Sequence, residues 1–172
     1  SLGLARFDGV AGEFFLDGPV GETLKARVAV GATHGGAWQK NFTRDDALGR
    51  VDKGATRALL NWRPTDRLDV DRSDTQATQI VAFRPQVAAN APRVPDVFSS
   101  PVAPADARAA NWNPDRDYAR DDRFRQTSLK AAYELHAGTT LTSITAYSDY
   151  DTRAFNDRDG MVPANFEFAT TG

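Results

Sequence analysis

The stretch of sequence that decides the fold runs from Thr127 to Tyr150 and reads TSLKAAYELHAGTTLTSITAYSDY. In its first part, apolar side chains take every second position and mostly polar side chains take the positions between them. This period of two is typical of a β-strand with one apolar and one wet face. The short break around Gly138 predicts that the chain returns at once as a hairpin. The return arm, Thr140 to Asp151, is rich in residue types that suit a pleated surface.

Both arms of this hairpin exceed the usual strand of about 5–6 residues. A strand of about 10 alternating residues is long enough to cross a bilayer at a tilt. No run of about 18 apolar residues occurs, so the sequence encodes no membrane-spanning helix. The mean hydropathy of -0.49 leaves a membrane sheet open, because alternating strands keep the mean low.

Composition excludes several classes of protein. The chain has 172 residues, enough for one domain with a core, and its 21 basic and 23 acidic residues give a net charge of -2. No basic stripe points to nucleic acid. Cysteine is absent, which excludes disulfides, cysteine metal sites and a cysteine nucleophile. No signal sequence opens the chain, and we expect it to be a piece of a longer protein.

Other segments also predict strands. The further strands are expected at Val10–Leu16, Leu24–Thr33, Asp52–Trp62 and Arg67–Thr75, the last of which looks too short for its neighbours. No sustained period runs from Gln76 to Asp122, where six prolines occur. A structureless connection of this length is unusual in a compact domain.

The predicted connections alternate in length. Short ones are expected at 17–22, 63–66 and 137–139, and long ones at 35–51, at 76–122 and from about 152. Soluble sandwiches have no reason to keep every second turn tight, whereas outer-membrane barrels have short periplasmic turns and long outer loops. Trp62 ends an apolar face beside a tight turn, where an aromatic girdle would lie, although a core aromatic under a hairpin is the plainer interpretation.

Several motifs in this order and spacing carry a resemblance to a known family. They are LDGPV at 16–20, LKARVAV at 24–30, GAWQKN at 36–41, RALLNWRPTDRL at 57–68 and TLTSITAY at 140–147. With them the chain resembles TonB-dependent outer-membrane receptors of Gram-negative bacteria, in the early barrel strands that follow the plug domain. The segment Leu68–Ser73 departs from the family pattern because it is shorter than the family's usual strand, which suggests a deletion.

The resemblance implies an all-β fold for residues 1–172: an antiparallel meander of about six strands, part of a 22-stranded transmembrane barrel. The plug and the remaining strands are absent, so we expect an open sheet. The implied function is uptake of ferric siderophores or other scarce nutrients across the outer membrane, by binding and gated transport without covalent chemistry. The implied partners are outer-membrane lipid, a small nutrient and, through the plug region, the TonB complex. No enzyme activity and no cofactor is expected.

The same resemblance implies which side chains face which medium. Those expected to face the lumen are Lys25, Arg27, Arg57, Asn61, Lys130 and Glu134. Those expected to face lipid are Leu24, Val28, Val30, Leu60, Trp62, Leu129, Tyr133 and Leu135. The rival hypothesis is a soluble β-sandwich or jelly-roll ligand-binding module, in which the same apolar faces form an internal core.

Aromatic and basic residues of the long loops are the candidate ligand-binding residues. They are Trp38, Lys40, Trp112, Arg116 and Tyr118, for which packing of loop against loop is the favoured alternative. The run from Asn111 to Asp117 alternates oxygen-bearing side chains, but a calcium loop needs Gly at its sixth and Glu at its twelfth position, where Arg116 and Asp122 stand. We therefore expect no metal site. His34 and His136 have no ligand spacing around them, and no catalytic set is expected.

Overall fold

The computed structural model describes residues 1–81, 104–116, 118–136, 138–157 and 167–172, and every regular element among them is a β-strand. The strands are β1 (Leu2–Ala5), β2 (Gly9–Pro19), β3 (Leu24–Gly35), β4 (Gln39–Asn41), β5 (Ala47–Leu48), β6 (Val51–Thr65), β7 (Leu68–Val81), β8 (Ala109–Ala110), β9 (Arg120–His136), β10 (Thr139–Asp157) and β11 (Glu167–Thr171). The predicted all-β class is confirmed.

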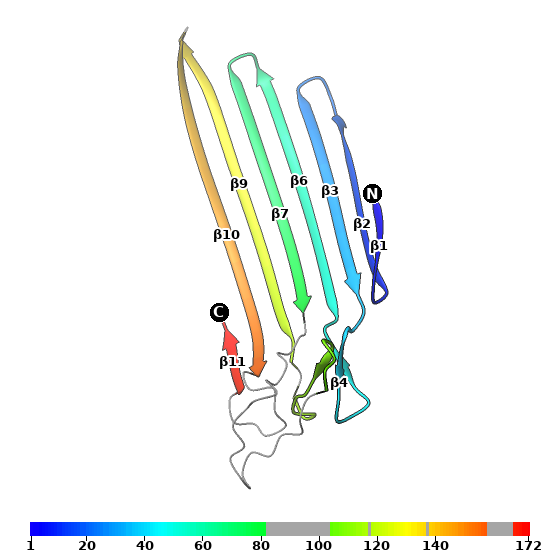
Figure 1. Ribbon diagram of the computed structural model, residues 1–172. Coiled ribbons are helices and arrows are strands. Elements are labelled where there is room, and N and C mark those ends of the chain that lie inside the picture. The colour runs from blue at the N-terminus through cyan, green and yellow to red at the C-terminus, as the bar shows by residue number, and fades with distance from the viewer. Residues whose placement is uncertain (82–103, 117, 137, 158–166) are drawn as a thin grey trace.

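Eight of these strands form one antiparallel sheet in the order β1-β2-β3-β6-β7-β9-β10-β11. The sheet is a single open layer, and the long strands β2, β3, β6, β7, β9 and β10 follow one another across it (Figure 1). The predicted meander of about six strands and its open edges are therefore confirmed, with β1 and β11 added as short edge strands. That these strands belong to a larger transmembrane barrel stays a prediction.

The register divides the sheet into two faces. Leu24 lies opposite Trp62, and Ala26 lies opposite Leu60, which in turn lies opposite Arg72 of β7. We call the face that bears Leu24 and Leu60 face A, and the opposite face, which bears Lys25 and Asn61, face B. The predicted lipid-facing residues lie on face A and the predicted lumen-facing residues on face B. The predicted division of these side chains into two opposite faces is confirmed, although the medium that surrounds each face stays a prediction.

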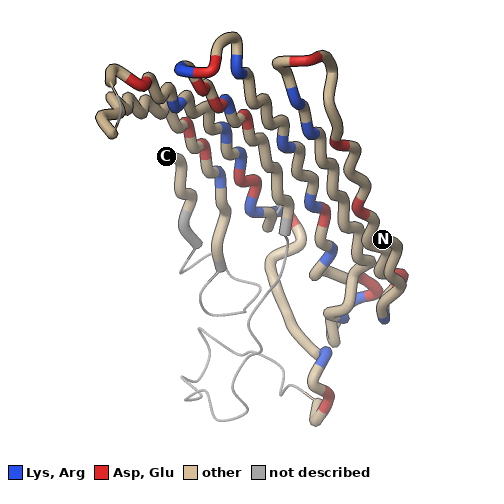
Figure 2. The backbone as a smooth tube through the Cα atoms, turned by 90° about the horizontal axis from the view of Figure 1, so that it is seen from above, with Lys and Arg blue, Asp and Glu red and all other residues tan. Residues whose placement is uncertain are grey.

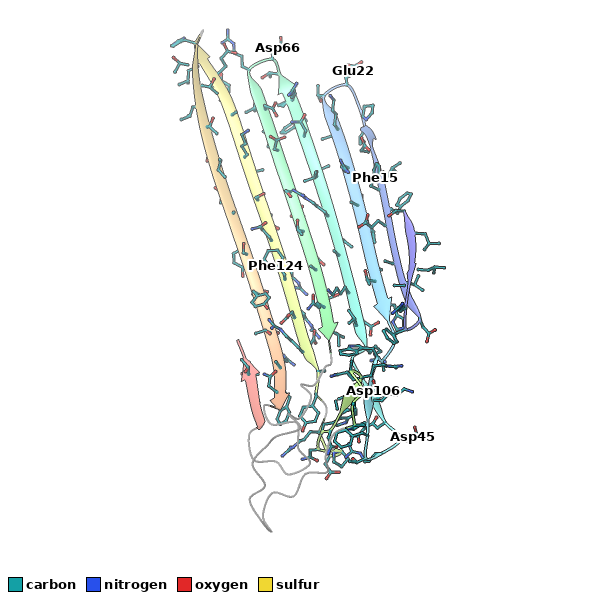
Figure 3. All side chains as sticks on the ribbon, in the orientation of Figure 1. Phe15, Glu22, Asp45, Asp66, Asp106 and Phe124 are labelled. Atoms are coloured by element: carbon teal, nitrogen blue, oxygen red, sulfur yellow. The ribbon has the colours of Figure 1, made fainter. Side chains whose placement is uncertain are left out.

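Large apolar side chains on face A are exposed. Leu60 is 39%, Trp62 47% and Leu129 45% exposed, although each lies on an inner strand of the sheet. Charged residues occur along the whole length of the sheet (Figure 2). In Figure 3 the side chains project from both sides of the single layer.

Strand boundaries in the middle of the chain differ from the sequence prediction. The strand expected to stop at Thr75 continues as β7 to Val81, so Leu68–Ser73 is not a shortened strand. Its partner β9 begins at Arg120, within the segment expected to lack structure, and the two pair along their whole length. The prediction failed because polar side chains occupy both faces in this half of β7, so no apolar period marks it.

From β2 onward, short and long connections alternate as predicted, whereas the preceding connection between β1 and β2, residues 6–8, is also short. The connections from β2 to β3, from β6 to β7 and from β9 to β10 lie at one end of the sheet, the turn end, where Glu22 and Asp66 lie in Figure 3. The long connections leave from the opposite end, the loop end. Gly138 has φ of 84°, a left-handed conformation that glycine adopts without strain. The register of β6 and β7 shifts between Trp62 and Thr65, next to Pro64, which has no N–H for the ladder.

The short turns are staggered in one direction. Leu24, the first residue of β3, lies opposite Trp62, three residues before the end of β6. Leu68, the first residue of β7, lies opposite Tyr133, again three residues before the end of β9. Each turn thus lies two to three residues beyond the one before it. This shift is roughly 7–10 Å along the strand direction, while successive turns are about 10 Å apart across the sheet, the width of two strands. Turns in one plane would therefore require strands tilted by about 35–45° from the normal to that plane.

The full length of β7 can be tested by a disulfide between β7 and β9. Thr78 and Arg123 lie directly opposite on face A, so the variant T78C/R123C should form the bond within one chain. The control T78C/F124C places the second thiol on face B and should stay reduced. Mass spectrometry after mild oxidation measures both. Equal reactivity of the two variants would contradict a β7 that extends to Val81.

Candidate functional site

Two long connections come together at the loop end of the sheet. They form the loop cluster, which we define as residues 36–50 and 104–119 without residue 117. Within it β4 pairs antiparallel with β5 and parallel with β8, so that Lys40 lies opposite Ala109. Arg108 adds a side-chain bond from its Nε to the carbonyl oxygen of Trp38, at 2.6 Å. Segments about 70 residues apart in sequence are thereby held as one unit, and Asp45 and Asp106 mark it in Figure 3.

Among the described residues, the buried apolar cluster lies in this loop cluster and not in the main sheet. Trp112 and Tyr118 are 2% and 1% exposed and pack with Ala110, and Leu48 and Phe155 contact them from the rim. The Tyr118 and Phe155 ring centroids are 5.6 Å apart. Because Phe155 belongs to β10, this packing fixes the loop cluster to the sheet.

A network of side-chain amides joins the two loops of the cluster. The Oδ1 of the fully buried Asn111 accepts bonds from Asn41 Nδ2 at 3.2 Å, from Thr43 Oγ1 at 3.1 Å and from the Trp112 amide at 3.0 Å. Asn41 Oδ1 in turn accepts from the amides of Thr43 and Arg44. These bonds fix the turn at residues 41–44 of the first loop against Asn111 of the second loop.

The five predicted ligand-binding residues do not share one exposed surface. Lys40 and Arg116 are exposed, Trp38 is half-buried against Gly49, and Trp112 and Tyr118 are in the buried cluster. The indole Nε1 of Trp112 donates to Asp46 at 3.1 Å. The alternative of loop-on-loop packing is therefore confirmed for Trp112 and Tyr118. Ligand binding by the five residues stays a prediction, which the burial of these two does not favour.

The oxygen-bearing run at 111–117 is engaged in the fold. Asn111 Oδ1 already has three donors, and Asn113 Oδ1 accepts the Asp115 amide at 2.9 Å, while residue 117 lies outside the described residues. Among the described residues, no group of three His, Cys, Asp or Glu side chains has the placement to hold a metal ion. His34 Nδ1 lies 2.5 Å from Asp52 Oδ1 on face A, and His136 is exposed at the end of β9.

Face B carries a hollow that sequence reasoning missed. One row of directly opposed residues crosses six strands there: Glu13, Gly31, Ala55, Ala77, Phe124 and Tyr150. These residues line a hollow of about 740 Å³ toward the loop end. The row combines the small residues Gly31, Ala55 and Ala77 with the aromatic rings of Phe124 and Tyr150. Only the register brings these residues into one row, so no local motif signals the hollow.

A carboxylate at the rim of this hollow is held by several donors. Asp122 accepts Arg120 Nε at 2.8 Å and the Thr152 hydroxyl. Partial burial acts to raise the pKa of Asp122, but bonds from Thr152, Arg120 and Tyr150 together outweigh it and lower that pKa below its ordinary value. Asp122 is therefore ionised at neutral pH and balanced by Arg120.

Comparison of the chain with known protein families, curated proteins and solved structures finds no match in any of the three. In the described part of the chain, no helix is long and apolar enough to cross a membrane.

The amide network can be tested with Asn111→Ala. Loss of the side chain leaves Asn41 Nδ2 and the Trp112 amide without their acceptor, whereas the Thr43 hydroxyl can still donate to Asn41 Oδ1 at 2.8 Å. The loss should destabilise the loop cluster by about 1–3 kcal/mol. Hydrogen exchange should then accelerate in peptides that cover β4 and β8 and stay unchanged in β3 and β6. The control Asn156→Ala alters an exposed asparagine and should leave both regions as they were. Unchanged exchange in β4 and β8 would show that the network does not hold the loops.

Proposed function

We propose that this chain forms part of the barrel wall of a TonB-dependent outer-membrane receptor. In this proposal the short turns lie on the periplasmic side and the loop cluster faces outward. The receptor takes up a siderophore or another scarce nutrient by binding and gated passage. Its partners are membrane lipid, the nutrient and, through the plug region of a longer protein, the TonB complex.

The observation that carries this proposal is an apolar band on one face of a single-layer sheet. The band consists of face A residues near the turn end: Phe14, Leu16, Leu24, Val28, Val30, Leu60, Trp62, Val70, Leu129, Tyr133, Leu141 and Tyr147. Twelve large side chains on one face form a much larger apolar patch than soluble monomers normally expose. In the described part of the chain, no second layer covers them. Lipid is the medium in which such a face is stable.

The extent of the band also supports a membrane. On most long strands it covers six to eight residues from the turn, which at a tilt of about 40° spans about 15–20 Å, somewhat less than the apolar height of about 25 Å in transmembrane barrels. Beyond it, face A turns polar. Arg125 lies opposite Asp149 and Arg123 opposite Asp151, at the level where strands of such a barrel would leave the hydrocarbon.

The stagger of the turns supports the same placement. Strands of transmembrane barrels tilt by about 35–45°, which is the tilt that brings the three short turns of this sheet into one plane. In a flat sheet that covers the core of a soluble protein, nothing requires successive turns to be displaced by a constant amount. Face B then lines the interior, and its hollow beneath the loop cluster is the place where a nutrient would pass.

One strand interrupts the band. Arg72 and Asp74 lie on face A of β7, where Arg72 Nε donates to Asp74 Oδ2 at 2.9 Å and Thr127 Oγ1 donates to Asp74 Oδ1 at 2.8 Å. Charges in hydrocarbon are costly unless they are paired. Here each charge has its partner on the same strand, so the pair reduces the cost without removing it.

The proposal is tested by a matched pair of substitutions, Val28→Lys on face A and Ala29→Lys on face B. The chain is refolded in detergent micelles, and urea unfolding is followed by circular dichroism. Val28→Lys should lower the free energy of unfolding by about 2 kcal/mol, because a lysine would enter the apolar band. Ala29→Lys should cost less than about 1 kcal/mol, because lumen positions accept charge.

Refolding in plain buffer is the experiment that can contradict the proposal. The proposal predicts no cooperative unfolding transition without micelles. A folded, cooperative monomer in buffer, with Val28→Lys strongly destabilising, would mean that the apolar face is covered within the protein. The soluble β-sandwich or jelly-roll binding module would then replace the receptor.

A further inference from the structure

Two cations on face B lie beside the hollow without a carboxylate partner. Lys53 and Arg57 lie on β6, one on either side of Ala55 along face B, and both are exposed. No carboxylate in the described part of the chain lies within ion-pair distance of either side chain. Arg120, on the same face, instead has Asp122 at 2.8 Å. The two β6 cations are therefore available to an anion that the fold itself does not supply.

The surroundings of these two cations are uncharged. Their directly opposed neighbours on β3 and β7 are Thr33, Gln79, Ala29 and Thr75. The carboxylates that line the hollow, Glu13 on β2 and Asp122 on β9, each lie two strands away from β6. Asp122 is also balanced by Arg120. Positive charge therefore predominates in the middle of the hollow, between the levels of Lys53 and Arg57.

Small residues leave room for a ligand between the cations. Gly31, Ala55 and Ala77 are directly opposed on three neighbouring strands, at the level between Lys53 and Arg57. Each cation is about 7 Å along the strand from Ala55, a distance that a lysine or arginine side chain can span. Both cations can thus contact one anionic group above Ala55. The hollow of about 740 Å³ has the size of a small-molecule site.

The same row supplies an aromatic surface for the rest of a ligand. Phe124 and Tyr150 are directly opposed on β9 and β10 and line the hollow. Tyr150 is 50% exposed, and Arg120 Nη2 donates to its hydroxyl oxygen at 3.3 Å, which holds the ring in place. Phe124 is two strands, about 10 Å, from Ala55. An uncovered ring at this distance can stack against a flat group of a ligand whose charge lies above Ala55.

We propose that the hollow on face B binds an organic anion that carries an aromatic ring. The anionic group lies between Lys53 and Arg57, and the ring lies against Phe124 and Tyr150. Charge complementarity selects an anion, because both cations then gain charge-assisted hydrogen bonds that the fold does not provide. This substrate class rests on the proposed function, since only in a receptor wall does face B line a passage. It adds the chemistry of the nutrient, which the proposed function leaves open.

The experiment measures binding of 4-phenylbutyrate to the chain refolded in non-ionic micelles, through the NMR chemical shifts of the Ala55 and Ala77 amides. Two analogues separate the contributions, because 4-phenylbutanamide lacks the charge and butyrate lacks the ring. Phenylbutyrate should shift both amides saturably, with a Kd at least tenfold below that of either analogue. Added salt should weaken this binding, since the cations are exposed. Equal affinity for the neutral amide would overturn the proposal.

Substitutions locate the anion. The variant K53Q/R57Q should raise the Kd for 4-phenylbutyrate at least tenfold. The matched control K25Q/K130Q removes two cations of the same face nearer the turn end and should change the Kd less than twofold. Phe124→Leu keeps an apolar side chain without the ring, so it should reduce the advantage of phenylbutyrate over butyrate. Circular dichroism checks that each variant is folded. An unchanged Kd in folded K53Q/R57Q would contradict the site.

The outcomes also separate this site from the receptor proposal. If Val28→Lys and Ala29→Lys differ as expected but 4-phenylbutyrate has no preference over its analogues, the barrel wall stands and the anion site is refuted. If the chain instead folds cooperatively in plain buffer and binds 4-phenylbutyrate through Lys53 and Arg57, the anion site stands and the receptor is refuted.

Discussion

The backbone register between the long strands is the constraint on which the rest of the structure depends. From β2 to β10 each pair keeps one register over most of its length, with irregularities only beside the tight turns at Pro64 and Thr139. A fixed register assigns every side chain to one of two faces, and a slip of one residue would exchange the faces. The apolar band, the charged rows beyond it and the hollow on face B are all consequences of this single alignment.

A single layer cannot bury either of its faces by itself. Globular domains solve this problem by stacking two layers around a core, whereas the described part of this chain packs a core only in the loop cluster. The hydrophobic stabilisation of the main sheet must therefore come from the medium or partner that covers the apolar side chains of face A. The proposed membrane supplies that medium, and the amide network of Asn41 and Asn111 fixes the loops where neither face of the sheet supports them.

The sequence predicted the parts of the fold that a local pattern encodes. Alternation in β3 and in the turn-end half of β9 identified these strands, and Gly138 marked the return of the chain from β9 to β10. The loop-end half of β7 was missed because polar side chains occur on both faces there: Gln76 and Thr78 lie on face A and Gln79 lies on face B. Only pairing with β6 and β9 makes that segment a strand, and pairing partners are not visible in a local window.

The candidate site was harder to predict than the sheet. Loop-on-loop packing was the favoured interpretation of Trp112 and Tyr118, but the sequence did not show that Leu48 and Phe155 are the residues that pack against them. The hollow on face B joins single residues from six strands, such as Gly31 and Tyr150, which no spacing along the chain connects. Local sequence carries the period of a strand, but it does not carry the order in which strands meet.

The central claim is that face A meets lipid at the turn end and water at the loop end. The most direct measurement places a single spin label at each position from Leu24 to His34 in bilayers and compares collisions with oxygen and with a water-soluble nickel complex. The account predicts oxygen contact at positions 24, 26, 28 and 30, nickel contact at 25, 27, 29 and 31, and nickel contact on both faces at 33 and 34. Even-numbered positions that neither reagent reaches would contradict it, since they would show a face covered by protein.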